Sequence, residues 1–410
     1  MVSLPTRYSD VSRYADELVA FLQEPLSVQI TGGIHVNDAF ISDAWDKLPA
    51  EWTQWWESLT SLRDAQDDLI KSLHKDPEAR KVDLPGRPES LTRWLERIRN
   101  ISLDRDQLVL PREMEHVELP RATISRIKVT KKLAEVQVAA RFIQHTCRTN
   151  NIKRVIDIGS GQGYLATTLA SVCGLRVLAV DGSAKQIDGS KAAARSAGLA
   201  EGKEITHLVR FVDGSGSLGS EIQAWAGGEP CLLTGLHACG SLSEHMVRLF
   251  TRVPCIARLT VVGCCYNHIT PRSPSCPNGF PISQHMRRRN LALSASALVT
   301  GCQAPTNWVP NPDSRFVRKY WYRAVLEKML YDKGISTAGA RPVWGIRTGD
   351  LESFESYTKR AAGSLGLKMG SDITDEDIGL WNRLSPSTDV SICRSTRRQM
   401  SAYCLCLITR

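Results

Sequence analysis

Residues 154–165 read RVIDIGSGQGYL, and this segment limits the possible folds more than any other part of the chain. The apolar residues around Asp157 predict a buried strand, and Gly159, Gly161 and Gly163 follow it at alternate positions. The residues after the third glycine predict a helix. Where a strand ends in bare glycines and a helix follows, a ligand can approach the main chain at points where any Cβ would collide.

Strands and helices are expected to alternate on both sides of this segment. A helix from Thr130 would carry apolar residues on one face: Leu133, Val136, Ala140, Ile143 and Cys147. Further strands are expected at 175–180, 205–212, 231–237 and 257–263. This alternation predicts an α/β protein with a parallel sheet, helices on both faces, and ligands beyond the carboxyl ends of the strands.

Asp181 follows the second expected strand, where its carboxylate can accept hydrogen bonds from both hydroxyls of a ribose. Dinucleotide sites have the spacing G-x-G-x-x-G, whereas this chain has G-x-G-x-G with an acid two places before the first glycine. The combination predicts a nucleoside site in which no pyrophosphate need be held. Asp213, just after the third strand, either lies beside the base or is a turn residue of the VDGSG segment.

The 410 residues carry a net charge of +9 and a pI near 9.0, with 42% apolar and 23% charged residues. This balance excludes a wholly disordered or collagen-like chain, and it permits nucleic acid as a partner. Twelve cysteines are too few for a disulfide scaffold. We find no secretory signal and no stretch apolar enough to span a bilayer. We therefore expect an intracellular protein, cytoplasmic or nuclear, with no membrane partner.

The fourth and fifth strands end in unusual sequences, His237-Ala238-Cys239-Gly240 and Gly263-Cys264-Cys265-Tyr266-Asn267. Carboxyl ends of neighbouring parallel strands open onto one crevice, so these two segments are expected to meet beside the nucleoside.

The glycine segment resembles motif I of class I S-adenosylmethionine-dependent methyltransferases. The two strand ends, with Phe280-Pro281-Ile282-Ser283, Lys131-Lys132 and Glu135, resemble the methyltransferase-like protein 25 family, which includes ribosomal RNA adenine dimethylase domain-containing proteins. The resemblance covers about 116–330, with a weaker likeness at 48–52. The chain is also faintly similar to tRNA 2′-O-methyltransferases that carry a CHHC-type zinc finger.

The resemblance implies a Rossmann-like class I methyltransferase sheet that binds S-adenosylmethionine. In such a site Asp157 orders the loop or meets the methionine end of the cofactor, the glycines line it, and Asp181 holds the ribose. The cofactor-binding residues implied are Lys132, Asp157, Gly159, Gly161, Gln162, Gly163, Tyr164, Asp181, Asp213 and His237.

The chain departs from the family in two places. The family pattern near Met-Ser-Pro-Lys-Lys-x-His-Glu has no histidine counterpart in Val129 to Glu135, so no role is carried over to that position. Residues 385–410 contain no convincing strand pair, although a class I sheet normally ends in two more strands. Either this tail is divergent or wrongly predicted, or the chain is a damaged copy.

Three chemistries fit the strand ends, with His237, Cys264, Cys265, Tyr266 and Asn267 as candidate catalytic residues. A substrate hydroxyl or amine can attack the methyl group in line while Tyr266 and Asn267 orient it. Alternatively, Cys264 or Cys265 is a nucleophile that adds to a pyrimidine. The third chemistry is zinc binding by His237, Cys239, Cys264, Cys265 and His268, but the spacing is not a finger pattern, so no metal is expected.

We expect a helical region over 1–115, a methyltransferase core over 116–330 and a C-terminal extension over 331–410. The tryptophans at 52, 55 and 56 fall on one helix face and are expected to be core. Aromatic and basic residues alternate over 315–323, where they either bind single-stranded RNA or pack a helix. Arg287 to Arg289 form either a phosphate clamp or a solvated helix face.

RNA is the expected acceptor, by family analogy and mild basicity. A protein side chain is the alternative acceptor, and a scaffold that binds the cofactor without turnover is the non-enzymatic alternative. The sequence leaves the oligomeric state open.

Overall fold

The structure is a computed structural model of the chain. It describes residues 4–32, 40–41, 46–59, 62–74, 76–78, 80, 84–103, 117–127, 130–213, 217–302, 315–335, 343 and 345–382. The chain divides into two compact units, one made of Met1–Arg105 with Ser283–Arg410 and the other of Asp106–Ile282. The second unit contains the sheet and every residue of the glycine segment.

The helices of the described residues are α1 (Val11–Gln23), α2 (Pro25–Gly32), α3 (Ala50–Ser58), α4 (Leu62–Ser72), α5 (Glu89–Ile101), α6 (Arg121–Ile124), α7 (Thr130–Thr149), α8 (Tyr164–Ser171), α9 (Ala184–Ser196), α10 (Ser217–Ala226), α11 (Ser241–Arg252), α12 (Gln284–Arg288), α13 (Ala295–Gly301), α14 (Arg315–Asp332), α15 (Phe354–Leu365) and α16 (Asp375–Asn382). Two short 3₁₀ helices are η2 (Tyr266–His268) and η4 (Gly349–Leu351). The strands are β1 (Arg154–Ile158), β2 (Arg176–Asp181), β3 (Ile205–Val209), β4 (Cys231–Cys239) and β5 (Ile256–Cys264).

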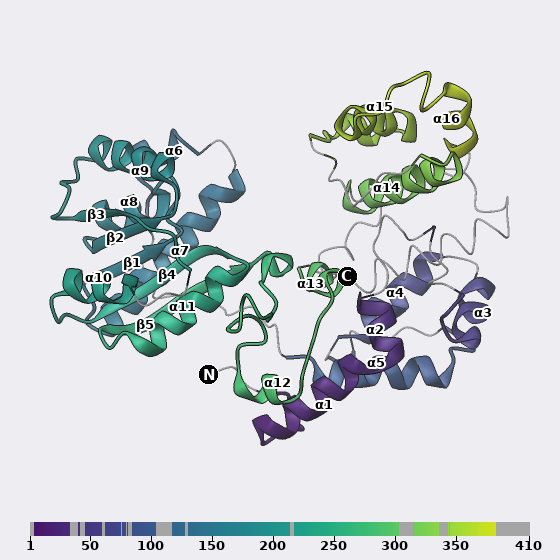
Figure 1. The fold of residues 1–410 in the computed structure, drawn as a ribbon, viewed down its shortest axis with the longest axis horizontal. Helices are drawn as coiled ribbons and strands as arrows, with labels where there is room; N and C mark the ends of the chain where they lie inside the picture. Colours follow the sequence, from purple (N-terminus) through teal and green to yellow (C-terminus); the bar gives the residue numbers. More distant parts are fainter. Residues whose placement is uncertain are drawn as a thin grey trace. The chain divides into compact units, whose positions relative to one another are not determined.

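The five strands form one parallel sheet in the order β3-β2-β1-β4-β5 (Figure 1). All five lie where the sequence predicts them, and the largest difference is that β3 ends at Val209 rather than at 212. From β1 the chain first adds β2 and β3 on one side, and then crosses to add β4 and β5 on the other side of β1. Open parallel sheets bind ligands at such a switch point, beyond the carboxyl ends of the strands.

Helices cover both faces of the sheet. Val155 of β1 packs in a cluster with residues of α7 and α8, whereas Ile156 and Ile158 pack with residues of α10 and α11. This division follows from the strand period, since successive side chains point to opposite faces. The predicted apolar face of α7 is confirmed, because Val136, Ala140, Ile143 and Cys147 are all buried. The α/β fold class with helices on both faces is therefore confirmed.

Helices α1 to α5 and α12 to α16 make up the other unit. The Asp10 side chain accepts a hydrogen bond from the Arg13 amide and caps α1. Trp52, Trp55 and Trp56 are buried in one core, which confirms that they pack rather than face solvent.

Two aromatic residues of α14 pack inside the protein. Trp321 and Tyr322 are buried in a cluster with residues of α15 and α16, so they pack this unit instead of offering a stacking surface for bases. Arg289, next to α12, binds the Asp16 carboxylate and the Ser12 carbonyl oxygen of α1. This arginine therefore joins two helices of its own unit.

The sheet-bearing unit ends at Ile282, whereas the sequence suggested a core over 116–330. Residues 283–330 group instead with the mainly helical unit. The expectations about Val129 and about residues 385–410 lie outside the described residues. Among the described helices, none is long and apolar enough to cross a membrane.

Candidate cofactor and acceptor site

The glycine loop after β1 is joined to the end of β2. The Asp181 carboxylate accepts a hydrogen bond from the Gly161 amide through Oδ2 at 2.9 Å and from the Ser183 amide through Oδ1 at 2.8 Å. The Gly159 amide donates to the Val180 carbonyl oxygen at 2.9 Å. A carboxylate has about four acceptor positions, so Asp181 retains two for a ligand after binding both loops.

The three glycines serve different purposes, although all have positive φ. A Cβ on Gly163 would lie 2.0 Å from the Ser190 hydroxyl oxygen, so this glycine lets the start of α8 pack against α9. A Cβ on Gly159 would lie 3.3 Å from the Leu242 side chain. A Cβ on Gly161 would meet nothing within 4 Å, so this backbone faces open space. Gly161 is the glycine whose surroundings best suit close approach by a ligand.

A cavity of about 930 Å³ lies beyond the carboxyl ends of the strands. Its walls include Gly159, Asp181, Asp213, Cys239 and His268, which come from the loops after five different strands or from the strand ends themselves. Small-molecule sites are typically clefts of about 300–1,000 Å³. The cavity therefore has the size of a cofactor site and lies at the switch point of the sheet.

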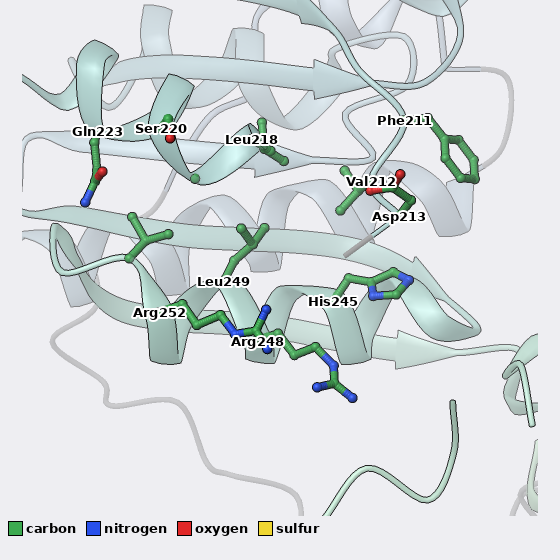
Figure 2. A pocket seen from close by; sticks show the side chains of 12 residues that line it. Phe211, Val212, Asp213, Leu218, Ser220, Gln223, His245, Arg248, Leu249 and Arg252 are labelled. Atoms are coloured by element: carbon green, nitrogen blue, oxygen red, sulfur yellow. The ribbon is translucent and has the colours of Figure 1, made fainter. Parts of the chain in front are cut away.

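A second, smaller hollow of about 150 Å³ lies between α10 and α11 and shares Asp213 with the large cavity. Figure 2 shows Phe211 and Asp213 at the end of β3, with His245 and Arg248 on α11 across from them. The Phe211 side chain is 78% exposed, which is unusual for a large apolar residue and leaves its ring available to a flat ligand.

Asp157 is buried at the end of β1, and within the described residues its Oδ2 has no hydrogen-bond partner. Burial raises the pKa of this carboxyl to about 7, the charge of Lys132 acts in the opposite direction, and Asp181 adds to the rise. The Ser160 hydroxyl, in the adjoining loop, likewise lacks a partner among the residues described. Buried polar atoms normally find partners, so these two atoms suit a polar ligand group.

An adenosyl ligand with an amino-acid tail needs acceptors for its ribose, space beside the main chain, and polar partners for its tail. Asp181 offers two acceptor positions for a ribose, Gly161 faces open space, and Asp157 and Ser160 offer polar atoms without partners. The residues fit such a ligand.

His237 turns toward α7 at the end of β4. Its Nε2 lies 3.1 Å from the Glu135 carboxylate, across 102 positions of sequence. Burial alone would raise the pKa of Glu135, but His237 together with Lys131 and Lys132 holds that pKa below its usual range. The pair places a charged hydrogen bond between the start of α7 and the end of β4.

The cysteines of the two strand ends do meet. The Cys239 and Cys264 sulfurs are 3.1 Å apart, and Cys265 completes a group whose sulfurs all lie within 4.8 Å of one another. Burial, followed by its hydrogen bonds to both neighbouring thiols, raises the pKa of Cys264 to about 12. A thiol with so high a pKa is a poor nucleophile at neutral pH, which disfavours attack on a pyrimidine by Cys264.

The other candidate residues lie apart from this group. The Gln162 side chain bonds to Arg126 and Gln186, and the Tyr164 hydroxyl donates to the Arg126 carbonyl oxygen at 3.4 Å. Both residues therefore join the loop to neighbouring helices. Tyr266 and Asn267 are exposed in η2 and are not among the described residues that line the large cavity.

Phe211 and the arginines of α11 were not identified from the sequence as site residues. Arg248 and Arg252 line both hollows, and Arg248 also binds Glu244 at 2.7 Å. Phe211, two residues before Asp213, fell inside the strand expected over 205–212, whereas the structure ends β3 at Val209 and leaves Phe211 in the loop. Its exposure could be known only from the packing of the loop.

Comparisons with known proteins agree with this geometry. Residues 131–272 match the family model described as a methyltransferase domain. The probable methyltransferase-like protein 25 of Homo sapiens is 29% identical over 146 residues, which are 34% of this chain and 24% of that protein. Its counterpart in Mus musculus is 28% identical over 148 residues, again 34% and 24% of the two chains.

The chain thus matches about a quarter of the length of these curated relatives. No solved structure matches the chain significantly. The matched region contains all five strands, the glycine loop and both cysteine-bearing strand ends. Residues 131–272 therefore match a methyltransferase domain, and this part of the chain is similar to the methyltransferase-like protein 25 relatives.

Proposed function

We propose that this chain is an S-adenosylmethionine-dependent methyltransferase that acts on RNA. The observation that carries the cofactor assignment is the hydrogen bond from the Gly161 amide to Asp181. This bond joins the glycine loop to the carboxylate that has acceptor positions left for a ribose, beside a cavity of about 930 Å³.

Bound S-adenosylmethionine supplies an electrophilic methyl group on a sulfonium with a good leaving group, so the protein mainly has to orient the reactants. Asp181 would accept hydrogen bonds from the ribose hydroxyls. Asp213 and Phe211 would lie beside the adenine base. Asp157 would accept a hydrogen bond from the cationic end of the cofactor, which also favours the ionised form of its carboxyl. The Glu135–His237 pair positions the start of α7 over the strand ends.

An RNA acceptor is supported by charge. The chain has a net charge of +9, and Arg210, Arg248 and Arg252 lie in the wall of the cavity, where they can meet phosphate. Glu244 and Glu221 already bind two of these arginines, so the positive surface is modest. The resemblance to the methyltransferase-like protein 25 family supports an RNA acceptor by analogy only, and not through any residue of the site. An RNA substrate also suits the expected cytoplasmic or nuclear location.

The cofactor assignment is tested by isothermal titration with S-adenosylhomocysteine. Micromolar binding is expected for the unaltered chain, and Gly161→Arg and Asp181→Ala should abolish it. Circular dichroism of both variants shows whether the fold is retained. Unimpaired binding in both folded variants would remove the assignment.

The acceptor is tested by incubating the full chain with radiolabelled S-adenosylmethionine and cell lysate. Label that is released by ribonuclease and resists protease supports RNA. Label that resists ribonuclease and is lost with protease identifies a protein acceptor instead. Cofactor binding with no labelled product points to the scaffold alternative, and both of these last results overturn the RNA proposal.

A further inference from the structure

The three thiols at the strand ends are held together by the sheet itself. Cys239 and Cys264 are paired in register on the neighbouring strands β4 and β5. The next residue, Cys265, has a φ of 51°, a conformation that costs a non-glycine residue about 1–2 kcal/mol. In an extended strand Cys265 would point to the opposite face from Cys264. The left-handed turn is what lets both sulfurs lie near Cys239.

Backbone contacts make this arrangement rigid. The Gly240 amide donates to the Cys264 carbonyl oxygen at 3.0 Å, directly between the two cysteine-bearing segments. A Cβ on Gly240 would lie 2.4 Å from the His268 carbonyl oxygen, so only glycine lets the two loops approach so closely. The positions of the sulfurs are therefore set by main chain on both sides.

The spacing of the sulfurs suits a tetrahedral metal ion. Zinc binds thiolate sulfur at about 2.3 Å, and tetrahedral geometry then places two sulfur ligands about 3.8 Å apart. The observed sulfurs range from 3.1 Å apart to within 4.8 Å, so changes of about 1 Å or less would produce that geometry. Three of the five residues considered as ligands from sequence are thus brought together. In the described part of the chain, neither His237 nor His268 belongs to this group.

We propose that Cys239, Cys264 and Cys265 bind one thiophilic divalent cation, with Zn²⁺ as the representative ion. Binding converts three thiols to thiolates and releases three protons to solvent, with no change of oxidation state. Three protein ligands leave one tetrahedral position for water or an acceptor atom, as in catalytic zinc sites. Cys239 lines the large cavity, so this position borders the proposed cofactor site.

The test begins with the full chain, purified under reducing conditions and stripped of metal. Zn²⁺ is added in competition with a chromophoric chelator, and Co²⁺ is added separately to detect thiolate charge-transfer absorption. The expected result is about one ion per chain, a thiolate band, and release of more than one proton at neutral pH. Absence of the thiolate band from the reduced, folded chain would overturn the proposal.

Single variants then identify the ligands. Cys239→Ser, Cys264→Ser and Cys265→Ser should each weaken Zn²⁺ binding about tenfold or more. Cys276→Ser is the matched control, because Cys276 lines the same cavity outside the thiol group. Equal losses in all four variants, or no loss in the first three, would refute the assignment. Circular dichroism excludes variants that fail to fold, in which case the result for the unaltered chain decides.

The same samples separate this proposal from the proposed function. Binding of S-adenosylhomocysteine is measured on the unaltered chain and on each variant. Absence of S-adenosylhomocysteine binding from the unaltered chain, with Zn²⁺ bound, contradicts the methyltransferase assignment alone. Binding of S-adenosylhomocysteine by the unaltered chain without any Zn²⁺ uptake contradicts the metal site alone.

Discussion

Replacing Gly161 by alanine separates the role of the glycine loop in binding from its role in folding. Gly161 has a φ of 55°, and an added Cβ would meet nothing of the protein within 4 Å. Gly198, in the same unit after α9, has a φ of 73° and the same open surroundings. The two substitutions therefore impose the same kind of backbone strain, but only the first adds an atom to the proposed binding loop.

The magnitudes follow from this comparison. Alanine at positive φ costs about 1–2 kcal/mol, and neither new methyl group collides with protein. Each variant should thus lower Tm by roughly 2–8 °C for a domain of this size. A methyl group that occupies space needed by the cofactor should weaken S-adenosylhomocysteine binding about tenfold or more, which is 1.4 kcal/mol, in Gly161→Ala only.

Differential scanning calorimetry and isothermal titration measure the two quantities on the same preparations. Gly198→Ala should match the unaltered chain in affinity while sharing the loss of Tm. Equal affinity in Gly161→Ala and Gly198→Ala would refute the argument that the open space at this loop receives the ligand. A much larger loss of Tm in Gly161→Ala would show instead that its backbone carries a structural contact.

Three further predictions concern neighbouring side chains. The pKa of Asp157 is raised from 3.8 to about 7 in the folded chain, so the folded state holds a proton that the unfolded state releases. The free energy of unfolding should therefore fall as pH rises from about 4 to about 7, and urea denaturation should show that Asp157→Asn removes this fall. A slope unchanged in the variant would contradict the cause. Asp181→Asn leaves one backbone amide facing an NH₂ group and should weaken S-adenosylhomocysteine binding by about 1.5–3 kcal/mol in calorimetry; full affinity would mean that the ribose binds elsewhere. Phe211→Ala should change stability by less than about 0.5 kcal/mol, because the ring is exposed, yet lose about 1–3 kcal/mol of affinity if adenine stacks there; unaltered binding would exclude stacking.

The parts of the site that were predicted correctly depend on neighbours in sequence. The burial of β1, the glycine turn and the start of α8 lie within twelve residues, and each requires a residue type that can be read locally. Asp181 could be placed because it ends the next strand, and parallel strands end at the same edge of a sheet. Its hydrogen bond to the Gly161 amide agrees with that expectation.

Contacts between distant residues were not predictable in the same way. Gln162 and Tyr164 lie inside the recognised motif, yet the structure turns both toward Arg126, 36 and 38 positions earlier. The spacing of a motif states which residues are near the loop, but not which way each side chain points. That direction depends on the helices packed against it.

The sequence by itself determined the fold class and the nucleoside-type loop, because strand and helix periods and glycine turns are properties of short segments. The sequence also placed the two cysteine-bearing strand ends beside each other. Only the tertiary structure decided that the three thiols form one group without His237, and that His237 pairs with Glu135 instead. These meetings depend on the register of β4 against β5 and on the packing of α7 over the sheet. Register and packing are set by burial of the whole core, which no single segment encodes.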